Sequence, residues 1–208
     1  MIIGPLANVK IIEIAGIGPA AMCAMLLSDL GATVLKVDRV EASGLGFPRP
    51  LRFNLVMRGR KVISLDLKRP DAVELVLKLV EQADGLIDPF RPGVAERLGI
   101  GPEACLRRNP RIVFGRATGW GQTGPLAKAA GHDLNYIAIT GALHMMGRKG
   151  QPPTPPMNLL GDYAGGALYL ALGMVAAILE ARQSGQGQVV DSAIVDGTIS
   201  LLTPLLGL

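Results

Sequence analysis

Short runs of β-branched and aliphatic residues alternate along this chain with longer stretches of helical spacing. Helices are expected over 20–30 and 71–83, the latter with apolar residues at every third or fourth position. Strands are expected over residues 10–15, 33–38, 61–67, 85–88 and 111–117. Strands separated by helices form right-handed βαβ units, so the alternation predicts an α/β fold with a mostly parallel sheet.

The composition supports a folded domain and excludes several classes of protein. Apolar residues make up 49% of the 208 residues and charged residues 18%, so a core is available and intrinsic disorder is excluded. A net charge of +4 mildly favours anionic ligands and is too small to indicate nucleic acid. Cys23 and Cys105 match no metal or disulfide spacing, which fits a reducing compartment. The first residues lack the pattern of a signal peptide, and we expect a cytoplasmic protein.

The longest apolar run covers residues 164–179, between Asp162 and Glu180. It is shorter than the roughly 20 residues that span a bilayer. We therefore expect a helix buried on nearly all sides and no membrane partner.

Ligands of open parallel sheets bind beyond the carboxyl ends of the strands, which directs attention to the loops there. The turn at residues 16–18 is a weak match to a dinucleotide-binding fingerprint, because Ala21 stands where a third glycine belongs; a tight turn explains it equally. Basic residues cluster in the same predicted loops: Arg39, Arg58, Arg60, Lys61, Lys68, Arg69 and Arg91. Converging cations suit a phosphorylated cofactor, and a solvated basic surface is the alternative.

Two residues are candidates for proton transfer. His132 stands at a predicted helix start, and a histidine that titrates near neutrality carries protons well. A buried structural histidine is the alternative. Asp162 opens the apolar helix, where it could cap the N-terminus or, among apolar neighbours, act as an acid with a raised pKa. The residues alone leave these alternatives open.

The order of the motifs is more specific than any one of them. They cover residues 12–19, 30–39, 58–68, 90–94, 118–125, 131–136, 158–166 and 185–191. In this order the chain resembles the class III CoA-transferase (CaiB/BaiF) family over essentially its whole length. The resemblance implies a Rossmann-like, mostly parallel sheet flanked by helices, the family's CoA-binding large domain, over residues 1–185. Residues 186–208 would be a linker or helix towards a second domain outside this chain.

Within the family, the runs at 132–136 and 158–162 resemble the branch that racemises 2-methylacyl-CoA thioesters. That resemblance implies that His132 and Asp162 form the acid/base pair. It implies that CoA, which enters as part of the substrate, is bound by Arg39, Leu65, Asp66, Leu67, Lys68, Arg91, Gly131, Asp133, Asn135 and Tyr136. It also implies an intertwined homodimer without metal or prosthetic group.

Inversion at the carbon beside a thioester requires a base on one face and an acid on the other. Neutral His132 would take the proton while protonated Asp162 gives one, or the reverse. The intermediate enolate needs hydrogen-bond donors at the thioester oxygen. A backbone N–H at the helix start near Asp162 is expected to be such a donor.

Two alternatives stand beside the racemase. A CoA-transferase of the same fold would use Asp162 as the nucleophile and would not need the histidine. Family members are usually nearly twice as long, with a later loop that closes over the substrate, so a CoA-binding remnant without activity of its own is the other alternative. The racemase is preferred because His132 stands in its full motif.

Overall fold

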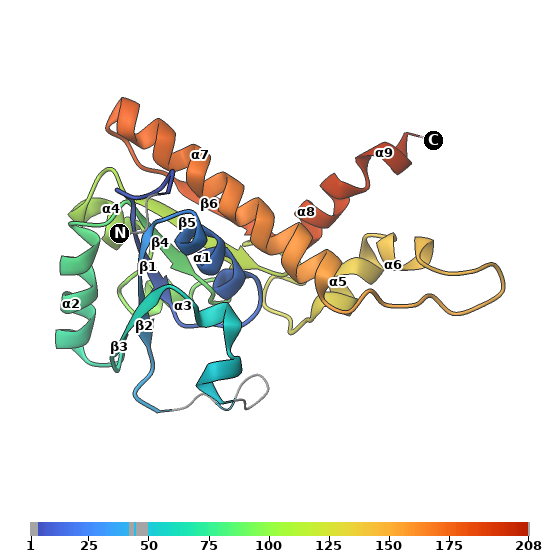
Figure 1. The fold of residues 1–208 in the computed structure, drawn as a ribbon, viewed down its shortest axis with the longest axis horizontal. Helices are drawn as coiled ribbons and strands as arrows, with labels where there is room; N and C mark the ends of the chain where they lie inside the picture. Colours follow the sequence, from blue (N-terminus) through green and yellow to red (C-terminus); the bar gives the residue numbers. More distant parts are fainter. Residues whose placement is uncertain (1–3, 42–43, 45–49, 208) are drawn as a thin grey trace.

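Six parallel strands form a single sheet in the computed structural model, which describes residues 4–41, 44 and 50–207 (Figure 1). The strand order is β3-β2-β1-β4-β5-β6, and each neighbouring pair is parallel. This is the order of the doubly wound nucleotide-binding fold. The strands are β1 (Lys10–Ile14), β2 (Thr33–Asp38), β3 (Arg60–Ser64), β4 (Gly85–Asp88), β5 (Val113–Thr118) and β6 (Val189–Ala193). The predicted α/β class with a mostly parallel sheet is confirmed.

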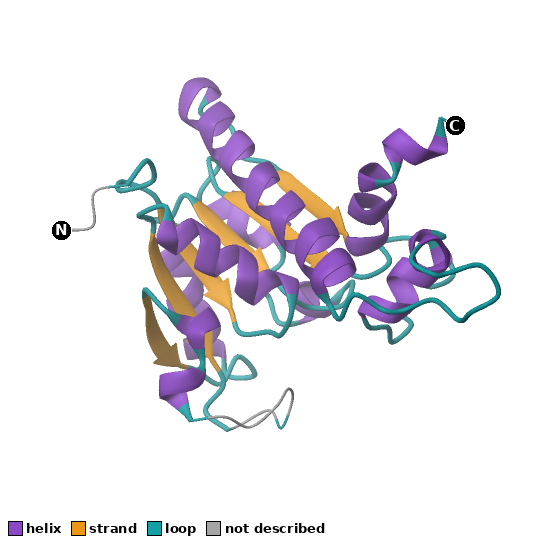
Figure 2. Cartoon of the chain, turned by 45° about the vertical axis from the view of Figure 1, so that its right-hand side comes forward, coloured by secondary structure: helices purple, strands orange, loops and turns teal. Residues whose placement is uncertain are grey.

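Helices cover both faces of the sheet, and each face has its own hydrophobic core. Side chains alternate between the faces of a strand, so Ile11 of β1 packs on one face and Ile12 on the other. Figure 2 shows two helices lying across the near face. The core under Ile11 involves α1 (Pro19–Asp29) and α7 (Tyr169–Ser184). The core under Ile12 involves α2 (Pro70–Val80), α3 (Val94–Arg97) and α4 (Pro102–Arg108).

The first two predicted helices are present with slightly different ends. α1 begins at Pro19, whose fixed φ suits a first helical position, directly after Gly18 with its positive φ of 68°. α2 also begins at a proline, Pro70, and ends at Val80 rather than at residue 83. These prolines place both helix starts just beyond the carboxyl ends of β1 and β3.

The expected domain boundary at residue 185 precedes a strand of the sheet. β6 runs from Val189 to Ala193 and pairs in parallel with β5, from Phe114↔Val189 to Thr118↔Ala193. Residues 189–193 therefore continue the same sheet as the residues before 185, because their backbone completes its edge. Only after β6 does the chain continue as the expected helix, α8 (Ile194–Leu201), followed by α9 (Thr203–Leu206).

The apolar run forms one continuous helical segment, a π-helix η3 (Leu159–Leu168) that leads into α7. The segment Leu159–Ser184 has 26 residues and contains an 18-residue stretch with a mean hydropathy of 1.7, enough by length and composition to cross a membrane. One face packs on the sheet through Leu170, Met174 and Ala177. The other face exposes Leu168, Leu172 and Leu179 by 51%, 67% and 60%. The expectation of burial on nearly all sides is wrong, because nothing in the described chain covers that second face.

Short helices extend from the carboxyl edge of the sheet. α5 (Asp133–Ile139) and α6 (Ala142–Met145) reach away from the sheet and end in a long loop (Figure 1). The 3-10 turns η1 (Leu51–Phe53) and η2 (Leu55–Met57) precede β3.

α8 crosses η3 at Gly165 and Gly197, where a Cβ on Gly197 would overlap the Gly165 carbonyl. The backbones of these two helices are therefore in direct contact.

A buried ion pair joins β1 to β3. Arg60 Nε lies 2.8 Å from Glu13 Oε2, and both side chains are completely buried. The Arg60 guanidinium also donates to the backbone carbonyls of Ala21 and Val56. Burial raises the pKa of Glu13 to about 7, and Arg60 acts in the opposite direction. Arg60 is thus a structural residue.

Candidate functional site

The candidate site lies at the carboxyl edge of the sheet, beside β1 and β4. These neighbouring strands connect onward in opposite directions, to β2 and to β5, which is the arrangement that opens a ligand crevice in doubly wound sheets. The loops that follow the two strands touch: a Cβ on Gly16 would overlap the Pro89 ring. Glycine at position 16 therefore allows the loop after β1 to lie directly against the loop after β4.

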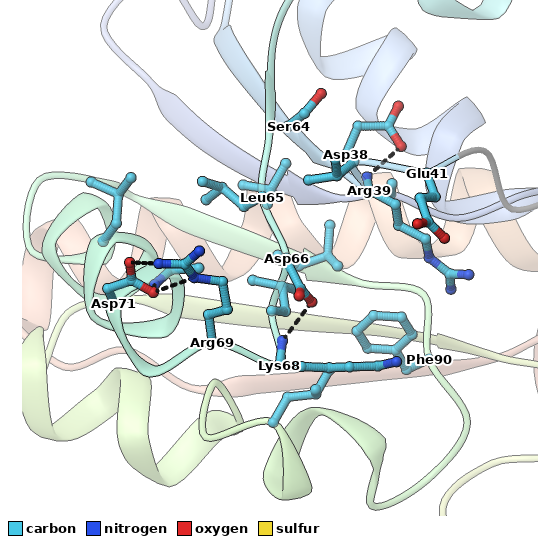
Figure 3. A pocket seen from close by; sticks show the side chains of 18 of the residues that line it. Asp38, Arg39, Glu41, Ser64, Leu65, Asp66, Lys68, Arg69, Asp71 and Phe90 are labelled. Carbon is cyan, nitrogen blue, oxygen red and sulfur yellow. Dashed lines mark hydrogen bonds and ion pairs between the residues drawn. The ribbon is translucent and has the colours of Figure 1, made fainter.

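A cavity of about 1100 Å³ opens at this edge (Figure 3). Its walls come from the ends of β1, β2 and β3 and from the segment after β4. Residues predicted for CoA binding that line it are Arg39, Leu65, Asp66, Leu67 and Lys68. Phe90, Val94 and Leu98 complete the apolar wall. The structure therefore places predicted residues from the loops after β2 and β3 in one cavity, together with Phe90 from the segment after β4.

Local contacts hold the cavity's acidic groups. Asp38 accepts the backbone N–H of Arg39 at 2.8 Å and pairs with Lys36 at 2.7 Å. Asp66 accepts the backbone N–H of Lys68 at 3.1 Å. Within the described part of the chain, neither the Arg39 nor the Lys68 side chain has an ion-pair partner. Two cationic groups are therefore available to an anionic ligand, and Figure 3 shows them entering from different loops.

Other members of the predicted basic cluster lie elsewhere. Arg60 begins β3, and Lys61 follows it, so both stand at the amino end of that strand. Arg58 pairs with Asp29 at the end of α1. The reason is topological, because the chain must return to the opposite edge of the sheet before a parallel β3 can start. The expectation that these three residues join a phosphate site is wrong.

Asp162 lies beside the turn that follows β1, and His132 is close enough to act electrostatically on its carboxyl group. His132 is the exposed N-cap of α5, and Asp162 is half-buried in the first turn of η3. Burial, reinforced by the nearby Asp133 carboxylate, raises the pKa of Asp162 to about 6, while Asn158 and His132 act in the opposite direction. Asp162 Oδ2 lies 3.7 Å from the position that a Cβ on Gly18 would occupy. The carboxyl group therefore faces the switch point of the sheet with an imidazole nearby.

The residues around His132 form the support of this pair. Asn135 Oδ1 accepts the backbone N–H of His132 at 2.9 Å. Asp133 is only 6% exposed, and its Oδ1 accepts the backbone N–H of Asp162 at 2.6 Å. The backbone N–H of Asp162, one of the amides at this helix start, is thus engaged by Asp133. The Asp133 carboxylate, in turn, is held under η3 rather than presented to the cavity.

Tyr136 packs beneath the same region. Its ring meets Trp120 edge-on, with centroids 4.7 Å apart, and a Cβ on Gly131 would crowd both rings. Burial raises the pKa of Tyr136 to about 12, with Asp162 adding to the rise and Arg91 opposing it. Arg91 is exposed and acts electrostatically on Tyr136, whereas the cavity wall is formed by its neighbour Phe90. The wall of the cavity thus does not include Arg91, Gly131 or Tyr136, which lie towards His132 instead.

Some contributors were not singled out by the sequence reading. Phe90 lines the cavity, Asn158 acts on the Asp162 carboxyl, and Trp120 packs on Tyr136. Each lies inside one of the ordered motifs, which is the signal that could have identified it. Among the described residues, no group of three or more His, Cys, Asp or Glu side chains is arranged to hold a metal ion.

Comparison with known proteins identifies the family. The model of CoA-transferase family III matches residues 6–207. The chain belongs to this family. It is 43% identical over 196 residues to alpha-methylacyl-CoA racemase of Mus musculus, covering 94% of this chain and 49% of that protein. It is 41% identical over 200 residues to the Homo sapiens racemase, covering 94% of this chain and 50% of that protein.

A solved structure of the family has the same fold. The crystal structure of a CaiB/BaiF family protein from Brucella suis superposes with a TM-score of 0.88 at 27% identity, covering 98% of this chain and 57% of that one. The chain therefore spans about half the length of the relatives that it matches.

Proposed function

We propose that this chain binds 2-methylacyl-CoA thioesters and racemises or epimerises them by α-proton transfer. The observation that carries the proposal is the position of Asp162 beside Gly18, with His132 close enough to act electrostatically on it, at the edge of the sheet that also holds the cavity of about 1100 Å³. The two residues are far apart in the sequence, and each lies in a motif shared with the racemase branch. Similarity to the mouse and human racemases supports the same chemistry.

CoA would occupy the cavity of about 1100 Å³. Arg39 and Lys68 would bind its phosphates through charge-assisted hydrogen bonds. Leu65 and Phe90 would provide the apolar wall for the adenine base. The acyl chain would then extend along the carboxyl edge of the sheet towards His132 and Asp162.

The proton transfer uses two different groups on opposite faces of the α-carbon. An imidazole nitrogen of neutral His132 takes the α-proton, and the electrons of the C–H bond move to the thioester oxygen to give an enolate. The protonated Asp162 carboxyl then donates its proton to the opposite face, which leaves His132 charged and Asp162 ionised. The reverse direction exchanges these roles. With a pKa of about 6, a useful fraction of Asp162 is protonated near neutral pH.

We further propose that the protein acts in the cytoplasm as an intertwined homodimer, with no metal or prosthetic group. The exposed leucines of α7 support a partner chain, and the free, buried Cys23 and Cys105 are compatible with a reducing compartment. Sedimentation velocity of the native protein tests the dimer.

The decisive experiment follows a 2-methylacyl-CoA by NMR in D₂O with no acceptor acid. The racemase proposal expects one deuterium at the α-carbon and loss of the stereochemical excess. A parallel reaction includes a free carboxylic acid and measures CoA transfer. Transfer without α-exchange would establish the CoA-transferase instead. Binding of CoA with neither reaction would contradict activity of this chain alone.

A further inference from the structure

The carboxylate of Asp133 lies under the first turn of the helix that carries Asp162. Its Oδ1 accepts the Asp162 backbone N–H at 2.6 Å, across 29 positions of sequence. A Cβ on Gly161 would stand 2.6 Å from the same oxygen, so only glycine allows this close approach. Asp133 Oδ2 is also buried, and within the described chain it has no hydrogen-bond partner. The carboxylate is therefore directed at the backbone of residues 161 and 162.

This contact replaces the ordinary cap of a helix. The first backbone N–H groups of a helix have no partner within it, and the residue that precedes the helix usually supplies one. Asn158, the N-cap of η3, makes no such side-chain bond. Asp133 supplies it from α5, and bonds to a charged acceptor are stronger than those to a neutral one. The first turn of η3 is thereby fixed to the start of α5.

The position of Asp133 connects the two proton-transfer residues. His132 and Asp133 are neighbours in the chain, so their Cα atoms lie about 3.8 Å apart. Asp133 then reaches the backbone of Asp162 through one side chain and one hydrogen bond. Asp133 is therefore a short, direct link between the backbone that carries the imidazole and the backbone that carries the carboxyl.

We propose that Asp133 is a positioning residue, which fixes the backbone of Asp162 relative to His132 and keeps a negative charge beside its carboxyl group. The inference rests on the proposed function, because it treats Asp162 as a proton-transfer group. It also reassigns Asp133, which the family resemblance places among the CoA-binding residues. A carboxylate that is 6% exposed and bonded to backbone is not available to a cofactor.

The charged and polar groups that face Asp162 are few. From α5 come His132, Asp133 and Tyr136, and from the residue before η3 comes Asn158. Burial is the largest cause of the raised pKa of Asp162. The negative charge of Asp133 is the next cause and raises the pKa further. Removing that charge should therefore lower the pKa of Asp162 without exposing it.

The test compares Asp133→Asn with Asp133→Ala in the full chain. An asparagine oxygen can still accept the Asp162 backbone N–H, but the side chain carries no charge. We expect Asp133→Asn to keep the fold and lower the Asp162 pKa, read from its ¹³C carboxyl signal and assigned by loss of that signal in Asp162→Asn. In α-proton exchange, the pH profile moves in the same direction, and kcat falls while KM stays within about twofold. Asp133→Ala, which also frees the backbone, should lower kcat by about 100-fold.

Asp84→Asn is the matched control. Asp84 accepts the Lys10 backbone N–H at 2.8 Å at the other edge of the sheet, so its neutralisation should leave the Asp162 pKa unchanged. An Asp162 pKa that does not move in Asp133→Asn would overturn the proposal. The titration needs no turnover, so a shifted pKa without any α-exchange would refute the proposed function and leave the positioning role standing.

A second measurement on the unmodified chain is independent of variant folding. A charge-assisted bond of 2.6 Å should move the Asp162 amide proton strongly downfield and protect it from solvent exchange. An ordinary shift together with rapid exchange would contradict the contact itself.

Discussion

Asp162 and Gly18 face each other across the carboxyl edge of the sheet, with Oδ2 of the aspartate 3.7 Å from where a Gly18 Cβ would stand. The turn after β1 is therefore one wall of the proposed proton-transfer site as well as the entry to α1. Gly18 has φ 68° and ψ −129°, a conformation that other residues adopt only with strain.

Gly18→Ala should therefore affect both stability and turnover. We expect the free energy of unfolding to fall by about 1–3 kcal/mol, because alanine strains this turn. The added methyl also crowds the Asp162 carboxyl, so α-proton exchange should fall further than the loss of folded protein explains. Urea unfolding and exchange rates measure the two effects. Gly185→Ala, at φ 77° with open space around it, should lose stability and retain exchange.

His132→Ala and Asp162→Ala should each abolish α-proton exchange, since each removes one of the two proton carriers. Neither residue lines the cavity, so CoA affinity should change by less than about threefold, well under 1.4 kcal/mol. Isothermal titration with CoA and ²H incorporation by NMR separate the two quantities. His144→Ala, on the exposed side of α6, is the control and should behave as the unmodified chain. Exchange that persists in His132→Ala would refute the two-base assignment.

The raised pKa of Asp162 gives stability a definite dependence on pH. The pKa rises from 3.8 to about 6 on folding, so the folded chain binds more protons than the unfolded chain between these values. Its contribution to stability is therefore lost as pH rises from about 4 to 6 and is constant above that. Asp162→Asn removes the effect. The free energy of unfolding of Asp162→Asn, relative to that of the unmodified chain, should increase across this window and reach about 1–2 kcal/mol. Partial exposure of the carboxyl keeps the difference this small.

Chemical denaturation of both proteins at a series of pH values measures that difference. Other titrating groups, Glu13 among them, are shared by the two proteins and cancel. If the difference in free energy of unfolding between the two proteins is constant between pH 4 and 6, the pKa of Asp162 is not raised in the folded chain.

Arg39→Ala should weaken CoA binding by about tenfold, the effect of one charge-assisted hydrogen bond. The weakening should diminish at high salt, because the interaction is between exposed charges. Arg107→Ala, an exposed arginine paired with Glu103 on α4, is the control. Equal affinities of the Arg39 and Arg107 variants would remove Arg39 from the CoA site.

Arg60→Ala should leave Glu13 buried without its partner. Breaking a buried pair in this way costs about 3–5 kcal/mol of folding free energy at pH 8. The cost should shrink below pH 7, because removing Arg60 raises the pKa of Glu13 above its value of about 7 in the unmodified chain, and the buried carboxyl is then protonated. Arg58→Ala breaks the exposed pair with Asp29 and an exposed hydrogen bond to the Leu55 carbonyl, and should cost less than about 1 kcal/mol. Thermal unfolding at both pH values compares the two.

Most of the fold could be predicted because hydrophobic periodicity is a local property. The runs that form β1, β2 and β4 and the spacing in α2 are readable without knowledge of any partner. β6 was missed because Asp191 and Ser192 make its run polar, and its place depends on pairing with β5. The bare face of α7 was missed for a similar reason, since composition does not say which side of an apolar helix is covered.

The candidate site was only partly readable. The ordered motifs identified His132, Asp162 and the cavity residues as candidates from the sequence. Their roles stay predictions. The functions of Asp133 and Arg60 could not be read, because each depends on a contact with a residue distant in the sequence. Cations before and after a strand look alike in sequence, whereas the parallel topology sends Arg60 and Lys68 to opposite edges.

The backbone contact between Gly165 and Gly197 makes the position of η3, the helix that carries Asp162, sensitive to substitutions in α8. α8 supports η3 there without any intervening side chain, so even a methyl group at position 197 would have to push the two helices apart. Such a change would tilt Asp162 while touching no reacting atom. An assay of the proposed α-proton exchange would then show a loss of turnover whose origin is the contact between α8 and η3, and not the loss of a proton carrier.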